Sequence, residues 1–200
     1  MRKAILAAVL MLLCALPALA APQTDSLSKA EVDMMLDTGL TTLGEYAQAL
    51  SARYFTWNYL GAATGETEFT LDVPGGAVTL NVSEASAYQD GAGGLVGADQ
   101  IANDVLALPA RLTGCVWENR ALTRVYAPGG LKIGDNADAL KAAFPQAEIS
   151  DISEYDIGFE QRARLRYATP DDWKEYYLVD FYLADGRIAL IRYSHWTDPE

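Results

Sequence analysis

Histidine and cysteine are scarce in this 200-residue sequence, which contains one histidine, His195, and two cysteines. Zinc and similar metal sites need several such ligands at fixed spacing, so the sequence offers no transition-metal site. A serine–histidine–aspartate arrangement could be built only through His195, which lies five residues before the end of the sequence. Because chain ends fray, we expect a partly exposed terminal histidine and no catalytic residue there.

Positive charge is also scarce. The chain has 15 lysines and arginines against 27 aspartates and glutamates, a formal net charge of -12. A protein this acidic repels nucleic acid and anionic lipid surfaces through its own field, so we expect neither as a partner. No stretch beyond the N-terminus stays apolar over the ~20 residues that cross a bilayer, and we expect no membrane span in the mature chain.

The N-terminus has the pattern of a secretory signal peptide. Arg2 and Lys3 precede an apolar run over residues 4–16, and a small-x-small sequence ends at Ala20. We expect residues 1–20 to be removed near that point, which makes the protein secreted or otherwise extracytoplasmic. The sequence leaves open whether it reaches the medium, the wall or a periplasm.

Cys14 lies inside the predicted signal peptide, so Cys115 is the only thiol expected in the mature chain. An intrachain disulfide is then impossible. A lipoprotein signal would need a small residue before Cys14, and Leu13 stands there instead. The apolar sequence LTGCVW around Cys115 favours a buried small hydrophobic residue over a reactive thiol.

Two helices are predicted near the start of the mature chain. Residues 28–31 (SKAE) have the spacing of a capping box, so we expect a helix over residues 29–37. Apolar residues then recur at helical spacing and predict a second helix over residues 42–55. These helices define an N-terminal helical segment, residues 21–60, which precedes an α+β domain over residues 61–200.

The α+β domain contains paired runs of alternating apolar and polar residues. Residues 69–82 predict a hairpin around a Pro-Gly-Gly turn, and residues 112–126 predict two strands around residues 118–119. The Asp-Gly pair at 185–186 is a strong hairpin signal near the C-terminus. Strands joined by tight turns favour an α+β fold in which an antiparallel sheet of hairpins packs with short helices.

The stretch GGLKIGDNADALKAAFP, residues 129–145, resembles a phosphate-binding loop only superficially. A Walker loop needs Gly-Lys-Ser/Thr where Asp135 and Asn136 follow Gly134, and the dinucleotide motif G-x-G-x-x-G is missing as well. Asp135 and Asp138 place two carboxylates at the helix start, where an anion would otherwise bind. We interpret Asp135 as the helix N-cap and Asp138 as a first-turn acidic residue, and we expect no cofactor.

A weak internal repeat is one further interpretation. GGLVGADQIANDVLALP (residues 93–109) matches residues 129–145 at six of seventeen positions, and hairpin-like sequence follows each segment. The two could be sub-repeats of a helix-plus-hairpin unit, over residues 93–128 and 129–196. Shared glycine, alanine and proline content explains the match equally well.

Residues 131–145, with Gly134-Asp135, Leu140 and the Phe144-Pro145 pair before a C-terminal hairpin, resemble a known pattern. The pattern is that of the superfamily of β-lactamase-inhibitory proteins and small outer-membrane assembly lipoproteins, and of related exported bacterial proteins. The resemblance covers roughly residues 122–194. It implies a helix packed on an antiparallel sheet that holds another protein, and it brings no catalytic residue.

Acidic residues cluster at 151–156 (Asp151, Glu154, Asp156) and at 171–175 (Asp171, Asp172, Glu175). Paired carboxylates across a cleft could hydrolyse a glycan, which makes an extracellular hydrolase the alternative function. Oxygen-rich loops could instead hold calcium in a structural module, although neither cluster has the EF-hand spacing. Acidic loops are most often only solvated.

The C-terminal hairpin supplies the candidate binding surface. A two-residue turn at 185–186 predicts the pairs Leu183 with Ile188, Phe181 with Leu190, and Val179 with Arg192. The opposite face would then present Tyr176, Asp180, Tyr182 and Tyr193. Tyrosine is enriched at binding hot spots because it buries a large area at low entropic cost. The alternative is that both faces are covered and the tyrosines belong to the core.

The sequence therefore predicts an exported, acidic, non-enzymatic α+β module of the cell envelope or secretome. Its expected partner is a protein or an envelope component, bound through the tyrosine-bearing face of the hairpin.

Overall fold

The computed structural model describes residues 27–61, 64–118, 125–152, 158–169 and 175–197. The predicted signal peptide, residues 1–20, lies outside the described residues. Within them the chain forms a nine-stranded antiparallel sheet and four α-helices, so the α+β class is confirmed with the sheet dominant. No helix in these ranges is long and apolar enough to cross a membrane.

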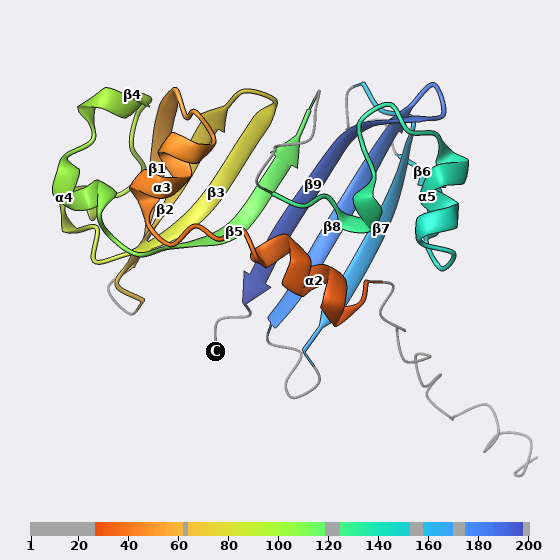
Figure 1. The fold of residues 1–200 in the computed structure, drawn as a ribbon, viewed down its shortest axis with the longest axis horizontal. Helices are drawn as coiled ribbons and strands as arrows, with labels where there is room; N and C mark the ends of the chain where they lie inside the picture. Colours follow the sequence, from red (N-terminus) through yellow and green to blue (C-terminus); the bar gives the residue numbers. More distant parts are fainter. Residues whose placement is uncertain (1–26, 62–63, 119–124, 153–157, 170–174, 198–200) are drawn as a thin grey trace, which may run out of the picture.

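The strands follow the order β4-β1-β2-β3-β5-β9-β8-β7-β6 across one sheet. The strands are β1 (Tyr54–Gly61), β2 (Glu66–Val73), β3 (Gly76–Ser83), β4 (Val96–Gly97), β5 (Ala110–Trp117), β6 (Ile149–Asp151), β7 (Gln161–Ala168), β8 (Glu175–Ala184) and β9 (Arg187–Thr197). The helices are α2 (Lys29–Leu36), α3 (Leu43–Ala49), α4 (Asn103–Leu106) and α5 (Ala137–Ala143). Helices α2, α3 and α5 lie over the same face of the sheet (Figure 1).

The first helix starts as the capping pattern predicts, and the second ends earlier than predicted. Ser28 caps α2 by accepting a hydrogen bond from the Glu31 amide, and Thr42 forms a full capping box with Glu45 at α3. The second helix stops at Ala49 because Ser51 takes a left-handed φ of 56° and β1 begins at Tyr54. The chain from Tyr54 pairs with β2, and this pairing overrides the helical spacing.

Strand β1, which spans the division predicted at residue 60, belongs to the central sheet. The suggested sub-repeats gain no support. Residues 93–109 contain a two-residue strand and the single-turn helix α4, whereas residues 129–145 form the longer helix α5. Of the two strands predicted over residues 112–126, the first lies within β5, and residues 119–124 lie outside the described residues.

The N-cap of α5 is Asn136, one residue later than predicted. Asn136 accepts a hydrogen bond from the Ala139 amide at 2.9 Å, whereas the Asp135 carboxylate accepts one from the Lys132 amide at 2.8 Å. The Asp135 carbonyl accepts a hydrogen bond from the amide of Ile188, which holds Asp135 outside the helix. Asp138 lies in the first turn, as expected for a carboxylate near the positive end of the helix dipole.

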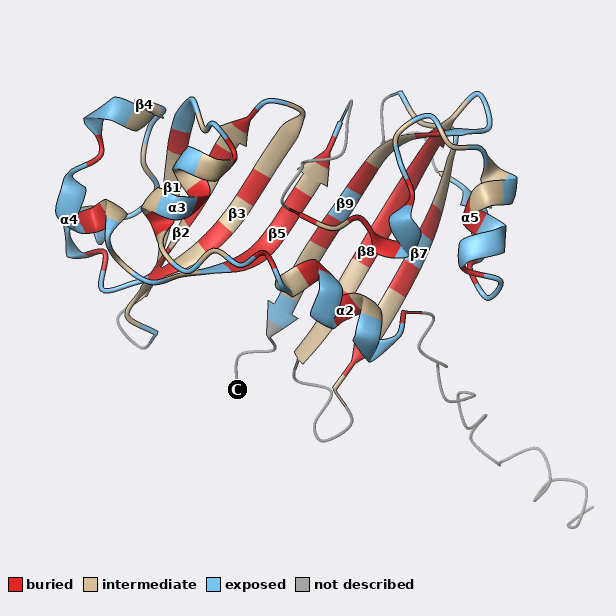
Figure 2. Ribbon diagram, in the orientation of Figure 1, coloured by how far each residue is buried: buried red, intermediate tan, exposed pale blue. Residues whose placement is uncertain are grey.

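The core fills the space between the sheet and the helices. Phe55, Phe69, Trp117 and Phe181 point toward this side and are fully buried. Figure 2 shows the buried positions alternating along the central strands, which is the two-residue period of a sheet with one covered face. Each such aromatic side chain contributes roughly 1.5–3 kcal/mol by leaving water. Cys115 belongs to this core, and burial raises the pKa of its thiol.

The C-terminal hairpin has the predicted turn, but its register is wrong beyond the first pair. Leu183 pairs with Ile188 as predicted, and then Tyr182 pairs with Leu190 because β9 carries one extra residue at this point. Such a bulge shifts every later side chain of the strand to the other face. Val179 therefore lies opposite Tyr193. The hairpin predicted over residues 69–82 is confirmed by the pairing of β2 with β3.

Candidate functional site

We call the side of the sheet opposite the helices the open face. Of the four residues of the predicted surface, Tyr176, Asp180 and Tyr182 have their side chains on this face, at alternate positions of β8. Tyr193 does not, because the bulge turns it toward the helices, where it is 1% exposed. The prediction that Tyr193 belongs to the binding surface is therefore wrong.

Only Tyr176 of these tyrosines is appreciably accessible. Tyr182 is 3% exposed because the ring of Phe159 lies 5.1 Å from its own and the guanidinium of Arg192 lies 5.4 Å above it. Asp180 is also 3% exposed. The predicted tyrosine surface is therefore mostly covered, and other side chains dominate the open face.

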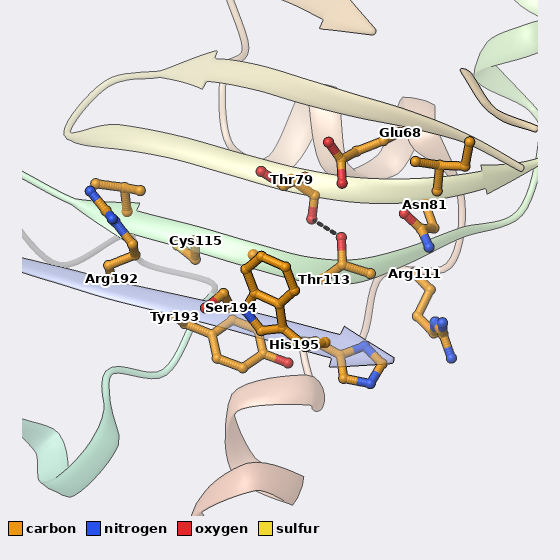
Figure 3. A pocket seen from close by; sticks show the side chains of 14 residues that line it. Glu68, Thr79, Asn81, Arg111, Thr113, Cys115, Arg192, Tyr193, Ser194 and His195 are labelled. Atoms are coloured by element: carbon orange, nitrogen blue, oxygen red, sulfur yellow. Dashed lines mark hydrogen bonds between the residues drawn. The ribbon is translucent and has the colours of Figure 1, made fainter. Parts of the chain in front are cut away.

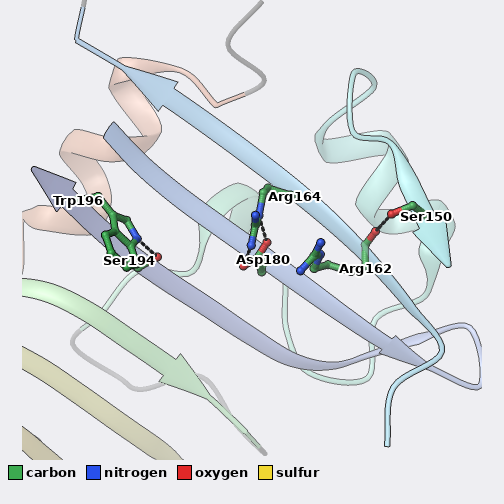
Figure 4. Close-up of polar contacts among 6 residues, drawn as sticks. All are labelled: Ser150, Arg162, Arg164, Asp180, Ser194 and Trp196. Carbon is green, nitrogen blue, oxygen red and sulfur yellow. Dashed lines mark hydrogen bonds and ion pairs between the residues drawn. The ribbon is translucent and has the colours of Figure 1, made fainter. Parts of the chain in front are cut away.

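Arginines form one such group. Arg162, Arg164 and Arg166 alternate along β7, and Arg192 lies opposite Asp180 on β9. The Arg164 guanidinium donates two hydrogen bonds, of 2.7 and 2.9 Å, to the Asp180 carboxylate (Figure 4). This bidentate pair stabilises an otherwise costly buried charge, and it raises the pKa of Arg164. The sequence QRARLRY, which repeats arginine at every second residue, was the signal that sequence reasoning missed.

A hollow of about 440 Å³ lies on the open face where β5 and β9 diverge (Figure 3). Strand β9 pairs with β5 only at residues 114–117 of β5. On the N-terminal side of Gly114 the two strands separate. We call this feature the central hollow. Small residues, including Thr79, Thr113 and Ser194, line it. A Cβ at Gly114 would approach the Thr79 Cβ to 3.2 Å, so a larger residue there would crowd the sheet.

Two exposed apolar side chains line the central hollow. Leu60, from β1, is 40% exposed, and Trp196, from β9, is 53% exposed. The Trp196 indole N–H donates to the Ser194 hydroxyl at 3.2 Å (Figure 4), which restrains the orientation of the ring. The hollow therefore combines small polar residues with an aromatic ring of restrained orientation.

A second hollow of about 350 Å³ lies on the open face over the start of β1, the end of β2 and the start of β3. Tyr54 and Leu95 line it with 43% and 66% of their surface exposed, beside an ion pair of 2.7 Å between Arg53 and Asp72. Five large hydrophobic side chains are exposed within the described ranges, and four of them line these two hollows. Such gathering is typical of an interaction surface, since apolar residues scattered singly need no explanation.

Acceptors without partners also line the central hollow. Glu68 on β2 lies directly opposite Asn81 on β3. Asn81 donates its amide N–H to the Glu66 carboxylate at 2.9 Å, and its buried Oδ1 has no hydrogen-bond partner. Burial raises the pKa of Glu68, and no described lysine, arginine or histidine lies within ion-pair distance of it. Buried polar atoms normally have a partner, so the Asn81 Oδ1 is unusual, and the half-buried Glu68 carboxylate beside it carries an unpaired charge.

His195 occupies a different environment from the frayed end that its position predicts. Its side chain is 5% exposed, stacks on Tyr177 at 4.5 Å between ring centroids, and lies 2.7 Å from the Glu175 carboxylate. Burial lowers the pKa of His195 more than Glu175 raises it. The Tyr177 hydroxyl donates to the same carboxylate at 2.8 Å, and burial together with that bond raises the pKa of Tyr177 to about 12.

This cluster fixes the end of β9 against β8. Among the described residues no serine, threonine or cysteine side chain is hydrogen-bonded to His195, so the geometry assembles no nucleophile with it. Glu175, which the alternative hydrolase would use, is bonded to His195 and Tyr177 instead. Of the other acidic candidates, Asp151 accepts a bond from Gln161, while residues 154, 156, 171 and 172 lie outside the described residues.

The part of the chain that the structure describes contains no group of three or more histidine, cysteine, aspartate or glutamate side chains placed to hold a metal ion. Comparison of the chain with protein-family models, with curated protein sequences and with solved structures found no match. The resemblance over residues 122–194 therefore stays a prediction.

Proposed function

We propose that this protein is an exported, non-enzymatic interaction module that binds another protein through the open face of its sheet. The observation that carries the proposal is the concentration of exposed large apolar side chains in the two hollows of that face. The proposal of export rests on the signal-peptide pattern of residues 1–20.

The composition of the open face agrees with a protein partner. Tryptophan, tyrosine and arginine are the residue types that dominate binding energy at protein interfaces, and Trp196, Tyr54 and Arg192 supply all three on this face. Arg192 lies over the Tyr182 ring, which limits the entropy that it would lose on binding.

Affinity capture with a matched control tests this proposal. The purified full chain would be immobilised and exposed to envelope and culture-fluid extracts, beside two variants. One variant carries Leu60→Ala and Trp196→Ala on the open face, and the control carries Met34→Ala, an exposed residue of α2 on the helix side. We expect the wild type and the Met34 variant to retain the same protein and the double variant to lose it.

The comparison is informative because the three exposed side chains contribute little to stability, so all the chains should fold. Circular dichroism would verify this. A protein retained equally by the double variant would contradict the proposal, as would retention of a glycan without any protein.

A further inference from the structure

Resting on the proposed function, we infer that the central hollow receives a basic side chain, lysine or arginine, from the partner protein. The inference concerns the chemistry of the partner, which the exposure of Leu60 and Trp196 alone does not specify. It depends on three features of the hollow: its hydrogen-bond acceptors, the orientation of the two arginine side chains that line it, and its apolar side chains.

The acceptors are the Glu68 carboxylate and the Asn81 Oδ1. They belong to cross-strand neighbours, and neither has a hydrogen-bond or ion-pair partner among the described residues. The Asn81 Oδ1 is a buried atom, and a buried acceptor without a donor is destabilising, whereas the Glu68 carboxylate is half-buried and unpaired. A lysine or arginine presents three to five N–H donors on one charged group, so a single side chain could pair with the Glu68 carboxylate and place a further donor beside Asn81.

The two arginines that line the hollow, Arg111 and Arg192, do not pair with the Glu68 carboxylate. Figure 3 shows Arg192 and Arg111 at opposite ends of the hollow, with Glu68 and Thr79 between them. The Arg192 guanidinium lies over Tyr182. Arg111 extends beside His195 and interacts electrostatically with Glu175. Neither arginine forms an ion pair with Glu68.

The walls suit the rest of a basic side chain. Lysine and arginine carry an apolar stem, which Leu60 can contact, and a cation that is attracted to the face of an indole such as that of Trp196. The net charge of -12 adds long-range attraction for a basic partner. An acidic side chain would meet Glu68 at the same place and would be repelled.

Nuclear magnetic resonance titration with defined probes tests the inference on the full chain. The probes are the capped tripeptides acetyl-Gly-Lys-Gly-amide and acetyl-Gly-Arg-Gly-amide, with the glutamine and glutamate analogues as neutral and acidic comparisons. We expect the basic probes to shift the Asn81 side-chain amide and Trp196 indole signals. Glu68→Gln should weaken that binding about threefold or more, since it removes the charge of a half-buried ion pair.

Glu148→Gln is the matched control. Glu148 is exposed and does not line the central hollow, so its substitution removes the same charge elsewhere and should leave the basic probes bound as in the wild type. The inference is overturned if the glutamate probe binds as well as the basic ones, if no probe shifts the hollow signals, or if Glu68→Gln has no effect.

Capture from extracts separates this inference from the proposed function. If Glu68→Gln retains the partner as tightly as the wild type while the Leu60 and Trp196 double variant loses it, the open face binds a protein. In that case the inference that the hollow receives a basic side chain is wrong. If the double variant also retains the partner, the proposed function itself is wrong.

Discussion

The two faces of the sheet are built from the same strands and yet have opposite characters. On the covered face Trp117 is 0% exposed, whereas on the open face Trp196 is 53% exposed. Polar residues on the solvent face of an antiparallel sheet are ordinary, and β2 follows that rule with Phe69 inside and Glu68 outside. The exposed apolar groups gathered around unpaired acceptors are what distinguish this open face from a merely solvated one.

The largest expected effect tests the covered face. Phe69→Ala removes a fully buried ring that packs edge-on against Phe55 and Tyr88, with centroids 6.4 and 5.3 Å away. We expect the free energy of unfolding to fall by about 3–5 kcal/mol, since the cavity adds to the lost burial. Trp196→Ala should change it by less than about 0.5 kcal/mol. Denaturant unfolding measures both, and equal losses would contradict the assignment of the two faces.

A smaller effect is expected at Asp180, the one buried carboxylate of the open face among the residues that the structure describes. Asp180→Asn leaves Arg164 without its anionic partner, and Arg164 remains 48% exposed to water, which moderates the loss. We expect a decrease of about 1–2 kcal/mol in unfolding free energy. Asp72→Asn, which breaks the exposed pair with Arg53, should cost no more than about 0.5 kcal/mol. If the two substitutions cost the same, burial does not distinguish these pairs.

The smallest effect concerns pH and the covered face. Burial lowers the pKa of His195 below the value of 6.5 expected for an unfolded chain, so the unfolded state binds a proton first as the pH falls. Stability should therefore decrease from about pH 7 toward pH 5, before most carboxylates titrate. His195→Gln should remove that part of the decrease. Unfolding curves at several pH values would show it, and an unchanged pH dependence in the variant would contradict the buried neutral state.

Local sequence patterns predicted the individual helices and turns of this fold better than the pairing of its strands. The capping sequence at Ser28 and the Asp-Gly turn at 185–186 each depend on a few neighbouring residues, and the structure contains both. The second helix was predicted too long because the pairing of β1 with β2 decides the state of Tyr54, and helical spacing carries no information about a partner strand.

The candidate site depended on longer-range features. The bulge in β9 moved Tyr193 from the predicted surface to the core, and a hydrophobic pattern that is apolar on both faces could not fix that register. The central hollow forms where β5 and β9 separate, and these strands are more than seventy residues apart in the sequence. The alternating arginines of β7, by contrast, were readable from their two-residue period alone.

The central claim is that the open face, and no other surface, contacts a protein partner. Site-specific photo-crosslinking tests it most directly, with a photoreactive amino acid in place of Leu60 in the central hollow or of Met34 on α2, in cells that produce the protein. Both positions are 40–43% exposed, so they differ in location and hardly in accessibility. We predict a crosslinked protein adduct from position 60 and none from position 34. An adduct from position 34 alone would contradict the account.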